Sequence, residues 1–253
     1  MQIDLTGRVA VVTGATGQLG RTMARTLAGC GADVAIHYHK NREKGEELQR
    51  EIAALGCRAA LVQADIADES SVLALRDAVS DALGVADIVV TNAVSQYPWK
   101  SILEQPVADF DDQYASCVRQ NVLMAKAFVP GMIAREWGRI VGINTECAMQ
   151  CFAGQAAYVA GKRGMDGVLR VLAQEVGAHG VTVNQVAPGW TISDRDRESN
   201  SERNEGYEKS VPLRRRGTDQ EIANAVAFLA SDLAGFITGV YLPVCGGNVM
   251  PRI

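Results

Sequence analysis

Tyr158 and Lys162 are the two residues whose types and spacing most directly suggest chemistry. They stand in the segment QAAYVAGK, residues 155–162, and lie one turn apart on one face if that segment is helical. A phenol with its ordinary pKa of about 10 is a poor base near neutrality, but a nearby ammonium group favours the phenolate and lowers that pKa. Tyr158 could then transfer a proton during carbonyl chemistry. A Tyr–Lys pair at this spacing also occurs on helices where both side chains only cover the surface.

A glycine-rich segment near the N-terminus carries a second pattern with chemical meaning. An apolar run over residues 8–13 leads directly into GATGQLG, residues 14–20, and a helical pattern follows over residues 21–30. Glycines allow a tight turn and close backbone approach, and the start of a helix offers free N–H groups to a pyrophosphate. Simple turn formation would also use glycines, but the order of strand, turn and helix predicts a dinucleotide loop. Its expected cofactor contacts are Gly14, Thr16, Gly17, Gln18, Leu19 and Gly20.

The end of the next predicted strand indicates which dinucleotide would bind. A site for NAD(H) places Asp or Glu about 20 residues after the glycines to bind the ribose 2′-hydroxyl. This chain has YHKNR at residues 38–42 instead. The side chains of His39, Lys40 and Arg42 could bind a 2′-phosphate, so the sequence favours NADP(H) over NAD(H). A solvated first turn of a helix would give the same pattern.

Short β-rich runs alternate with longer helical patterns along the whole chain. The predicted strands cover residues 8–13, 33–38, 59–62, 86–91, 138–144, 181–187 and 240–244. Runs that are apolar on both faces belong to a parallel sheet with helices on both sides, so we expect a doubly wound α/β fold. The length of 253 residues fits one domain over residues 1–253. The charged segment 193–216 is expected to be an insertion that forms a substrate lid.

Composition excludes several classes of protein. The chain has 25 Lys and Arg against 29 Asp and Glu, a net charge of −4, so we expect no nucleic-acid partner. Its six cysteines include no CxxC pair, which predicts a reduced cytoplasmic protein without a metal site. The start of the chain has no secretory pattern, and glycines and prolines interrupt the long uncharged stretches, so we expect no membrane association.

Taken together, these patterns resemble the short-chain dehydrogenase/reductase family in its compact form of about 250 residues, over essentially the whole chain. The matching positions are Thr13 with Gly14, Gly17 and Gly20; Asp65-Ile66; Thr91-Asn92-Ala93; Asn121; Gly138 to Val141; Tyr158 and Lys162; Pro188-Gly189; Ile237-Thr238-Gly239; and Gly246-Gly247. The resemblance implies a Rossmann-like, mostly parallel seven-stranded sheet, a nicotinamide cofactor, and a homodimer or homotetramer built from the long helices.

The resemblance also implies roles for individual residues. Tyr158 would give a proton to a carbonyl or take one from an alcohol while hydride moves to or from the nicotinamide. Lys162 would hold the ribose hydroxyls and lower the pKa of the tyrosine, and Asn121 would position a water in the proton relay. The remaining expected cofactor contacts are Tyr38, His39, Asp65, Ile66, Asn92, Ala93, Pro188, Gly189 and Ile192.

Three positions depart from the family pattern. Thr145 stands thirteen residues before Tyr158, where the family normally has the serine that polarises the carbonyl. Its hydroxyl is retained, but its extra methyl group restricts χ1 and narrows the pocket. Val94 replaces a glycine after Asn-Ala, so the loop is expected to differ locally or carry strain. Gln18 occupies the usual place of a glycine, and this glycine spacing is more typical of the family's extended members.

The sequence therefore predicts an NAD(P)(H)-dependent oxidoreductase that interconverts a secondary alcohol and a ketone or aldehyde. Polar and aromatic residues after the fourth to sixth strands favour a modest polar carbonyl, such as a 3-oxoacyl group or a keto-sugar acid. The alternative is a cofactor-binding sensor or scaffold with little turnover, which Thr145 and Val94 would suit. An epimerase or dehydratase is a third option, suggested by the glycine spacing.

Overall fold

The computed structural model describes residues 2–251, which form one sheet of seven strands covered by helices on both faces. The strand order is β3-β2-β1-β4-β5-β6-β7, and every neighbouring pair is parallel. The expectation of a mostly parallel sheet is thus exceeded. The strands are β1 (Val9–Val12), β2 (Asp33–Tyr38), β3 (Ala59–Gln63), β4 (Ile88–Thr91), β5 (Gly138–Ile143), β6 (Val181–Pro188) and β7 (Tyr241–Val244).

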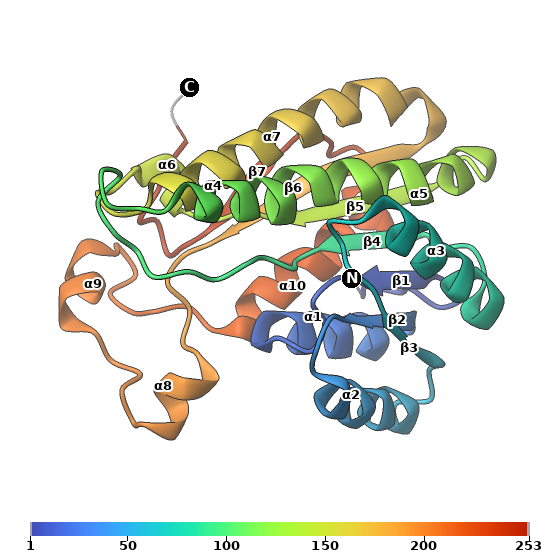
Figure 1. The fold of residues 1–253 in the computed structure, drawn as a ribbon. Helices are drawn as coiled ribbons and strands as arrows, with labels where there is room; N and C mark the ends of the chain where they lie inside the picture. Colours follow the sequence, from blue (N-terminus) through green and yellow to red (C-terminus); the bar gives the residue numbers. More distant parts are fainter. Residues whose placement is uncertain (1, 252–253) are drawn as a thin grey trace.

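Two layers of helices enclose this sheet (Figure 1). One layer holds α1 (Gln18–Gly29), α2 (Arg42–Ala54) and α10 (Asp219–Leu229), and the other holds α3 (Glu69–Leu83), α5 (Gln120–Ala134) and α7 (Ala156–Val176). Along the chain, shorter helices connect these longer elements. They are α4 (Val107–Gln113), the π-helix η1 (Tyr114–Arg119), α6 (Cys147–Gln150), η2 (Gly177–His179), α8 (Asp194–Glu198), α9 (Glu205–Ser210) and η3 (Asp232–Ala234).

The alternation of side chains along each strand produces two separate hydrophobic cores. On β1, Ala10 and Val12 pack into the core beneath α1 and α10, while Val9 and Val11 pack into the core beneath α3 and α5. Successive side chains of a strand point to opposite faces, so an entirely apolar β1 supplies both cores. The double-sided burial expected from the sequence is confirmed.

The predicted strands match the observed ones to within two residues at each end. Segment 193–216 contains α8 and α9, which stand away from the sheet (Figure 1), and the first residue of α8 contacts the start of α1. The side chain of Thr218 accepts a hydrogen bond from the N–H of Glu221, and the Glu221 side chain accepts from the N–H of Thr218, so a capping box starts α10 directly after this segment.

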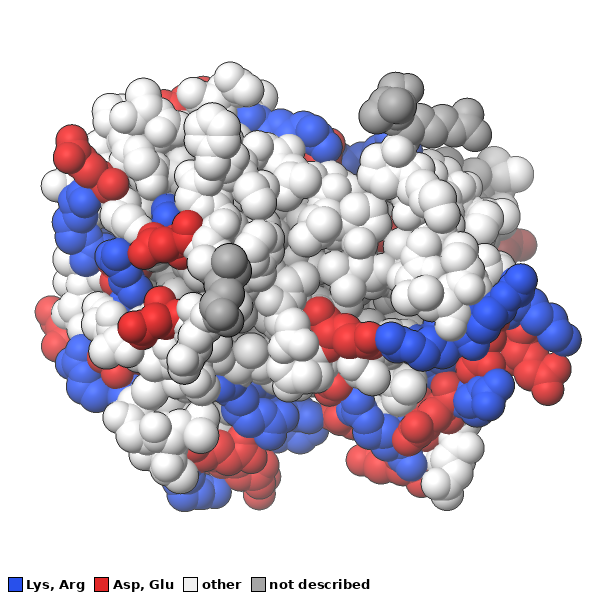
Figure 2. All heavy atoms as spheres, turned by 180° about the vertical axis from the view of Figure 1, so that it is seen from behind, with Lys and Arg blue, Asp and Glu red and all other residues white. Residues whose placement is uncertain are grey.

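Charged side chains are intermixed on the surface of the protein. Figure 2 shows a broad uncharged centre on one face, with acidic and basic side chains side by side around its rim. Within residues 2–251, no helix combines the length and the apolar character needed to cross a membrane.

Candidate active site

The predicted functional residues converge on the edge of the sheet where the parallel strands end. The glycine-rich loop follows β1, Asn92 follows β4, Thr145 follows β5, and Gly189 follows β6. The strand order reverses between β1 and β4, and doubly wound folds bind ligands at such a switch point.

The glycine-rich loop has the shape required to receive a dinucleotide. Helix α1 begins at Gln18. Gly17 occupies the N-cap position and has no side chain that could accept a hydrogen bond from the first N–H groups of the helix. A Cβ atom at Gly20 would lie 2.8 Å from Cα of Ala15, which requires glycine there. These residues fit the pyrophosphate of a nicotinamide dinucleotide. Gly14 has a φ of +62°, which also favours glycine.

His37 holds this loop in place, a role that the sequence analysis missed. The N–H of Gly14 donates to Nδ1 of His37 over 2.9 Å, and Nε2 of His37 lies 3.0 Å from the carbonyl oxygen of Ala64. Because Nδ1 must accept, Nε2 carries the proton and donates to Ala64. The residue is 1% exposed, and burial lowers the pKa of His37 to about 4. A neutral imidazole therefore connects the glycine loop to the end of β3.

Thr13 connects β1 to β4. Its hydroxyl oxygen accepts from the N–H groups of Asn92 and Ala93 over 2.9 and 3.1 Å, and it donates to Oε1 of Gln120 over 2.6 Å. The side-chain amide of Asn92 donates back to the carbonyl oxygen of Thr13 over 2.9 Å. Gln120 is buried and was not predicted from the sequence.

Val94 fits this loop with less disturbance than the sequence suggested. It is not among the residues with positive φ, and its side chain packs partly buried against the core beneath α3 and α5. Of the two alternatives expected at Val94, a local difference or strain, the backbone shows no strain, because it does not enter the region that a β-branched residue resists.

The expected adenosine contacts lie at the ends of β2 and β3. Tyr38 is buried, whereas His39 and Asp65 are exposed and Ile66 is half-buried. Exposed Arg42 donates to Glu46 over 2.7 Å, one turn along α2. Arg42, one of the three basic residues predicted to bind a 2′-phosphate, is therefore already paired with a carboxylate of its own helix.

Tyr158 and Lys162 lie on one face of α7, as their spacing predicted. Nζ of Lys162 is 5.8 Å from the centre of the Tyr158 ring and donates to the carbonyl oxygen of Ile143 over 2.5 Å. Burial raises the pKa of Tyr158 above its ordinary value and lowers the pKa of Lys162. The expected lowering of the tyrosine pKa by Lys162 is thus not seen, because desolvation of the phenol outweighs other effects and the ammonium is directed at a carbonyl.

Thr145 lies beside Tyr158. Contact with the Thr145 side chain opposes the rise in the Tyr158 pKa. The Thr145 oxygen accepts from the N–H of Cys147 over 3.2 Å, which leaves the hydroxyl proton free to be donated. The hydroxyl of Tyr241 donates to the carbonyl oxygen of Thr145 and supports this loop from β7.

Asn121 is buried at the start of α5. Its side-chain oxygen accepts from the Thr91 hydroxyl over 2.7 Å, and its amide donates to the carbonyl oxygen of Cys117 in the π-helix η1 over 2.6 Å. A π-helical turn inside a longer helix is frequent at functional sites. These two bonds fix the orientation of Asn121 relative to β4.

Two aromatic residues after β4 pack against Tyr158. The hydroxyl of Tyr97 accepts from the N–H of Tyr158 over 2.5 Å, and the ring of Trp99 stacks on that of Tyr158 with 6.3 Å between ring centres. The sequence analysis counted the aromatic residues after the fourth strand as part of the substrate pocket but did not predict these contacts. Their one available signal was the pair of aromatic residues two positions apart after a strand.

A buried carboxylate stands next to Thr145. Glu146 is 4% exposed, and burial raises its pKa, while hydrogen bonds from Asn248 and Tyr207 oppose that rise. The Tyr207 hydroxyl also accepts from the N–H of Trp190 over 2.8 Å. A Cβ atom at Gly189 would lie 2.6 Å from this hydroxyl, so glycine permits the approach.

Most of the basic side chains of segment 193–216 are paired with acidic ones. Arg197 bonds to Asp219 over 2.8 Å, Arg203 to Glu208 over 2.7 Å, and Lys209 to Glu205 over 3.3 Å. Buried Arg216 pairs with Asp196 over 2.7 Å and lowers its pKa. Such pairing agrees with interspersed charges on a solvated segment better than with a row of cations facing an acidic ligand.

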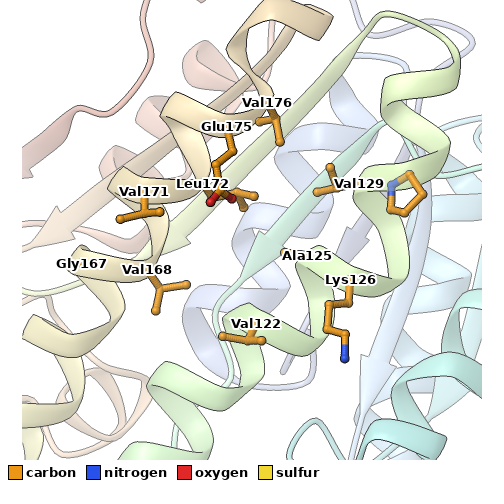
Figure 3. Close-up of a pocket in the computed structure, with 11 residues that line it drawn as sticks. Val122, Ala125, Lys126, Val129, Gly167, Val168, Val171, Leu172, Glu175 and Val176 are labelled. Atoms are coloured by element: carbon orange, nitrogen blue, oxygen red, sulfur yellow. The ribbon is translucent and has the colours of Figure 1, made fainter.

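A large apolar groove lies elsewhere, between α5 and α7 (Figure 3). It has a volume of about 640 Å³, and Val122, Val129, Val168, Val171 and Leu172 are among its lining residues. The Tyr158 site does not contribute to it. Within residues 2–251, no group of three or more His, Cys, Asp or Glu side chains is arranged to hold a metal ion.

Comparisons with known proteins agree over nearly the whole chain. Residues 14–248 match the family model described as enoyl-(acyl carrier protein) reductase. The 3-oxoacyl-[acyl-carrier-protein] reductase of Pseudomonas aeruginosa is 36% identical over 252 residues, which cover 98% of this chain and 100% of the relative. The reductase of the same name from Staphylococcus aureus is 35% identical over 241 residues and covers 95% and 98%.

Two crystal structures share the fold. A protein provisionally described as a gluconate dehydrogenase, from Agrobacterium tumefaciens, has a TM-score of 0.90 at 26% identity, with 98% of each chain covered. A protein provisionally described as a short-chain alcohol dehydrogenase, from Sinorhizobium meliloti, has a TM-score of 0.88 at 30% identity and the same coverage.

Proposed function

Because the chain belongs to the short-chain dehydrogenase/reductase family and is an NAD(P)-dependent oxidoreductase of secondary alcohols and ketones, we propose that Tyr158 is its proton-transferring residue. The observation that carries the proposal is the position of the Tyr158 phenol beside Thr145, with Nζ of Lys162 5.8 Å from the ring centre. The alternative of a sensor without turnover is not favoured, because a relative that is 36% identical carries the name of a reductase.

A nicotinamide cofactor held by these residues would supply or accept a hydride at the substrate carbon. During reduction, the Thr145 hydroxyl donates a hydrogen bond to the carbonyl oxygen, and Tyr158 gives that oxygen its phenolic proton as the carbon accepts the hydride. During oxidation, Tyr158 takes the proton back from the alcohol. With its raised pKa, the phenol of Tyr158 carries its proton near neutral pH, which is the protonation state that reduction requires.

Two further residues complete the proposed catalytic group. Lys162 would bind the ribose hydroxyls of the cofactor, and its ammonium would lie on the same helix face as the phenol. Asn121 would hold a water of the proton relay, and the two hydrogen bonds that fix its side chain support such a positioning role.

The proposed cofactor contacts are those predicted from the sequence, and NADP(H) is the proposed cofactor. Exposed His39 and Lys40 after β2 support it, because neither is paired with a carboxylate by the contacts found within residues 2–251. Dissociation constants for NADPH and NADH decide the question, and a tenfold or greater preference for NADH would contradict the proposal.

We propose a small polar carbonyl compound as substrate, with segment 193–216 as the lid over it. The names of the curated relatives support a 3-oxoacyl thioester. Nicotinamide absorbance should therefore be followed with 3-oxoacyl thioesters, keto-sugar acids and small ketones. We expect the wild-type protein to turn over at least one of these substrate classes, and Tyr158→Phe to abolish that turnover. A protein that binds the cofactor but turns over no compound of the panel would refute the proposal.

We also propose that copies of the chain associate through α5 and α7 as a homodimer or homotetramer. The apolar groove between these helices supports this, since Val171 is 58% exposed on one wall and Val122 is 39% exposed on the other. A reduced, cytoplasmic setting is proposed as well, supported by six cysteines that are all free thiols.

A further inference from the structure

We propose that the side chain of Gln18 couples the proposed lid to the cofactor loop, so that ordering of segment 193–216 and binding of the dinucleotide favour each other. This inference rests on the proposed function, because it takes the loop as the cofactor site and the segment as the substrate lid. Gln18 would act as a positioning residue, through the lid backbone.

The geometry of the Gln18 carboxamide carries the inference. Its Nε2 donates to the carbonyl oxygen of Ile192 over 2.6 Å, and its Oε1 accepts from the N–H of Asp194 over 3.1 Å. Asp194 is the first residue of α8, and the first N–H groups of a helix have no partner within the helix. One side chain from the glycine loop thus satisfies two backbone groups at the point where the lid begins.

Arg21 provides a second connection between the same two regions. Its guanidinium forms an ion pair with Asp194 and donates to the carbonyl oxygen of Thr16 over 3.0 Å. Asp194 also pairs with Arg197 of α8 over 3.3 Å. The first turn of α1 therefore contacts the lid on one side and the glycine loop on the other.

Gln18 is also the position at which the loop departs from the glycine pattern. A glycine at this position has no side chain and could not make either hydrogen bond. The first turn of α1 offers its N–H groups to the dinucleotide and its side chains to the lid. Because coupling between two binding events is reciprocal, a lid ordered on this turn strengthens binding of the cofactor, and a bound cofactor that fixes the turn orders the lid.

Hydrogen exchange of the free protein tests the coupling without depending on turnover. Gln18→Met keeps the length of the side chain and removes both the donor and the acceptor. Gln49→Met is the matched control, because Gln49 donates to the carbonyl oxygen of Ala59 over 2.8 Å on distant α2. We expect amides of residues 192–199 to exchange at least about fivefold faster in Gln18→Met, and at the wild-type rate in Gln49→Met.

Release of NADPH provides a second readout on the same variants. With Gln18→Met, we expect NADPH to dissociate at least about fivefold faster and the KM for the carbonyl substrate to rise by more than kcat falls. Unchanged exchange of residues 192–199 in Gln18→Met would overturn the coupling. A third result separates the two proposals: Gln18→Met speeds amide exchange of residues 192–199, but the wild-type protein binds no nicotinamide nucleotide. In that case the proposed function fails, and the contact between the glycine-rich loop and segment 193–216 is still supported.

Discussion

The hydroxyl of Tyr207 donates a hydrogen bond of 3.0 Å to Oε1 of Glu146, which joins α9 to the loop after β5. The other carboxylate oxygen accepts from Nδ2 of Asn248 over 3.0 Å. One buried carboxylate therefore gathers the proposed lid and the C-terminal segment beside Thr145. The proposed lid is therefore bonded at two places, to the glycine-rich loop through Gln18 and to the loop after β5 through Tyr207.

Replacing Tyr207 by Phe should weaken the contact of the proposed lid with the loop after β5 and leave its contact with Gln18 unchanged. The ring can still pack edge-on against Trp190, but Glu146 and the N–H of Trp190 each lose a partner. An unsatisfied buried group costs roughly 1–3 kcal/mol, so we expect a lower Tm and a several-fold higher KM for the carbonyl substrate. Steady-state kinetics and calorimetry measure both, and a KM equal to that of the wild type would show that this contact does not shape the substrate pocket.

Thr145 tests the proposed hydrogen bond to the carbonyl oxygen. We expect Thr145→Ser to retain turnover, because the hydroxyl remains, and Thr145→Ala to lose at least about tenfold in kcat. Both variants remove the methyl group, so their difference isolates the hydroxyl. Full turnover by the Ala variant would refute the role.

Gly20 tests the fit of the cofactor loop. A methyl group in Gly20→Ala would lie 2.8 Å from Cα of Ala15, so we expect the loop to shift and the affinity for NADPH to fall at least about tenfold. Gly29→Ala is the control within the same helix, because its new methyl group meets nothing within 4 Å. Isothermal titration of NADPH compares them. Equal affinities in the two variants would contradict this account of the loop.

His37 should make stability depend on pH. Its pKa of about 4 in the folded protein lies below the ordinary 6.5, so the unfolded chain binds the proton more readily. The stabilisation is present above pH 6.5 and is lost as the pH falls towards 4, by about 2 kcal/mol between pH 7 and pH 5. Urea unfolding at these two pH values should show a smaller loss in His37→Gln than in the wild type. Identical losses would mean that His37 is not buried neutral.

Val171 tests the proposed association of copies. An aspartate in the groove between α5 and α7 would place a charge in an apolar interface, so we expect Val171→Asp to shift the protein to a smaller species in light scattering. Leu55→Asp, at an apolar residue 52% exposed beside α2, should leave the mass unchanged. A monomeric wild-type protein would end the proposal.

Local patterns allowed the sheet, the glycine loop and the face shared by Tyr158 and Lys162 to be predicted from the sequence. A strand, a turn or one helical turn is specified by neighbouring residues, so its signal can be read directly. His37 and Gln120 were missed because each acts on a partner far along the chain: His37 contacts Gly14 across 23 residues and Gln120 contacts Thr13 across 107. The raised pKa of Tyr158 was missed because burial depends on the packed fold.

The bridge made by Thr13 has a consequence for preparing the protein. A single hydroxyl joins β1 to Asn92 and Gln120, which lie 79 and 107 residues further along the chain, so the proposed cofactor cradle is assembled from distant segments. An N-terminal fragment that stops short of β4 carries the whole glycine motif and yet lacks one wall of the cradle. Affinity resin bearing immobilised nucleotide should therefore retain only chains that have finished folding, and would separate them from truncated or misfolded material in a single step.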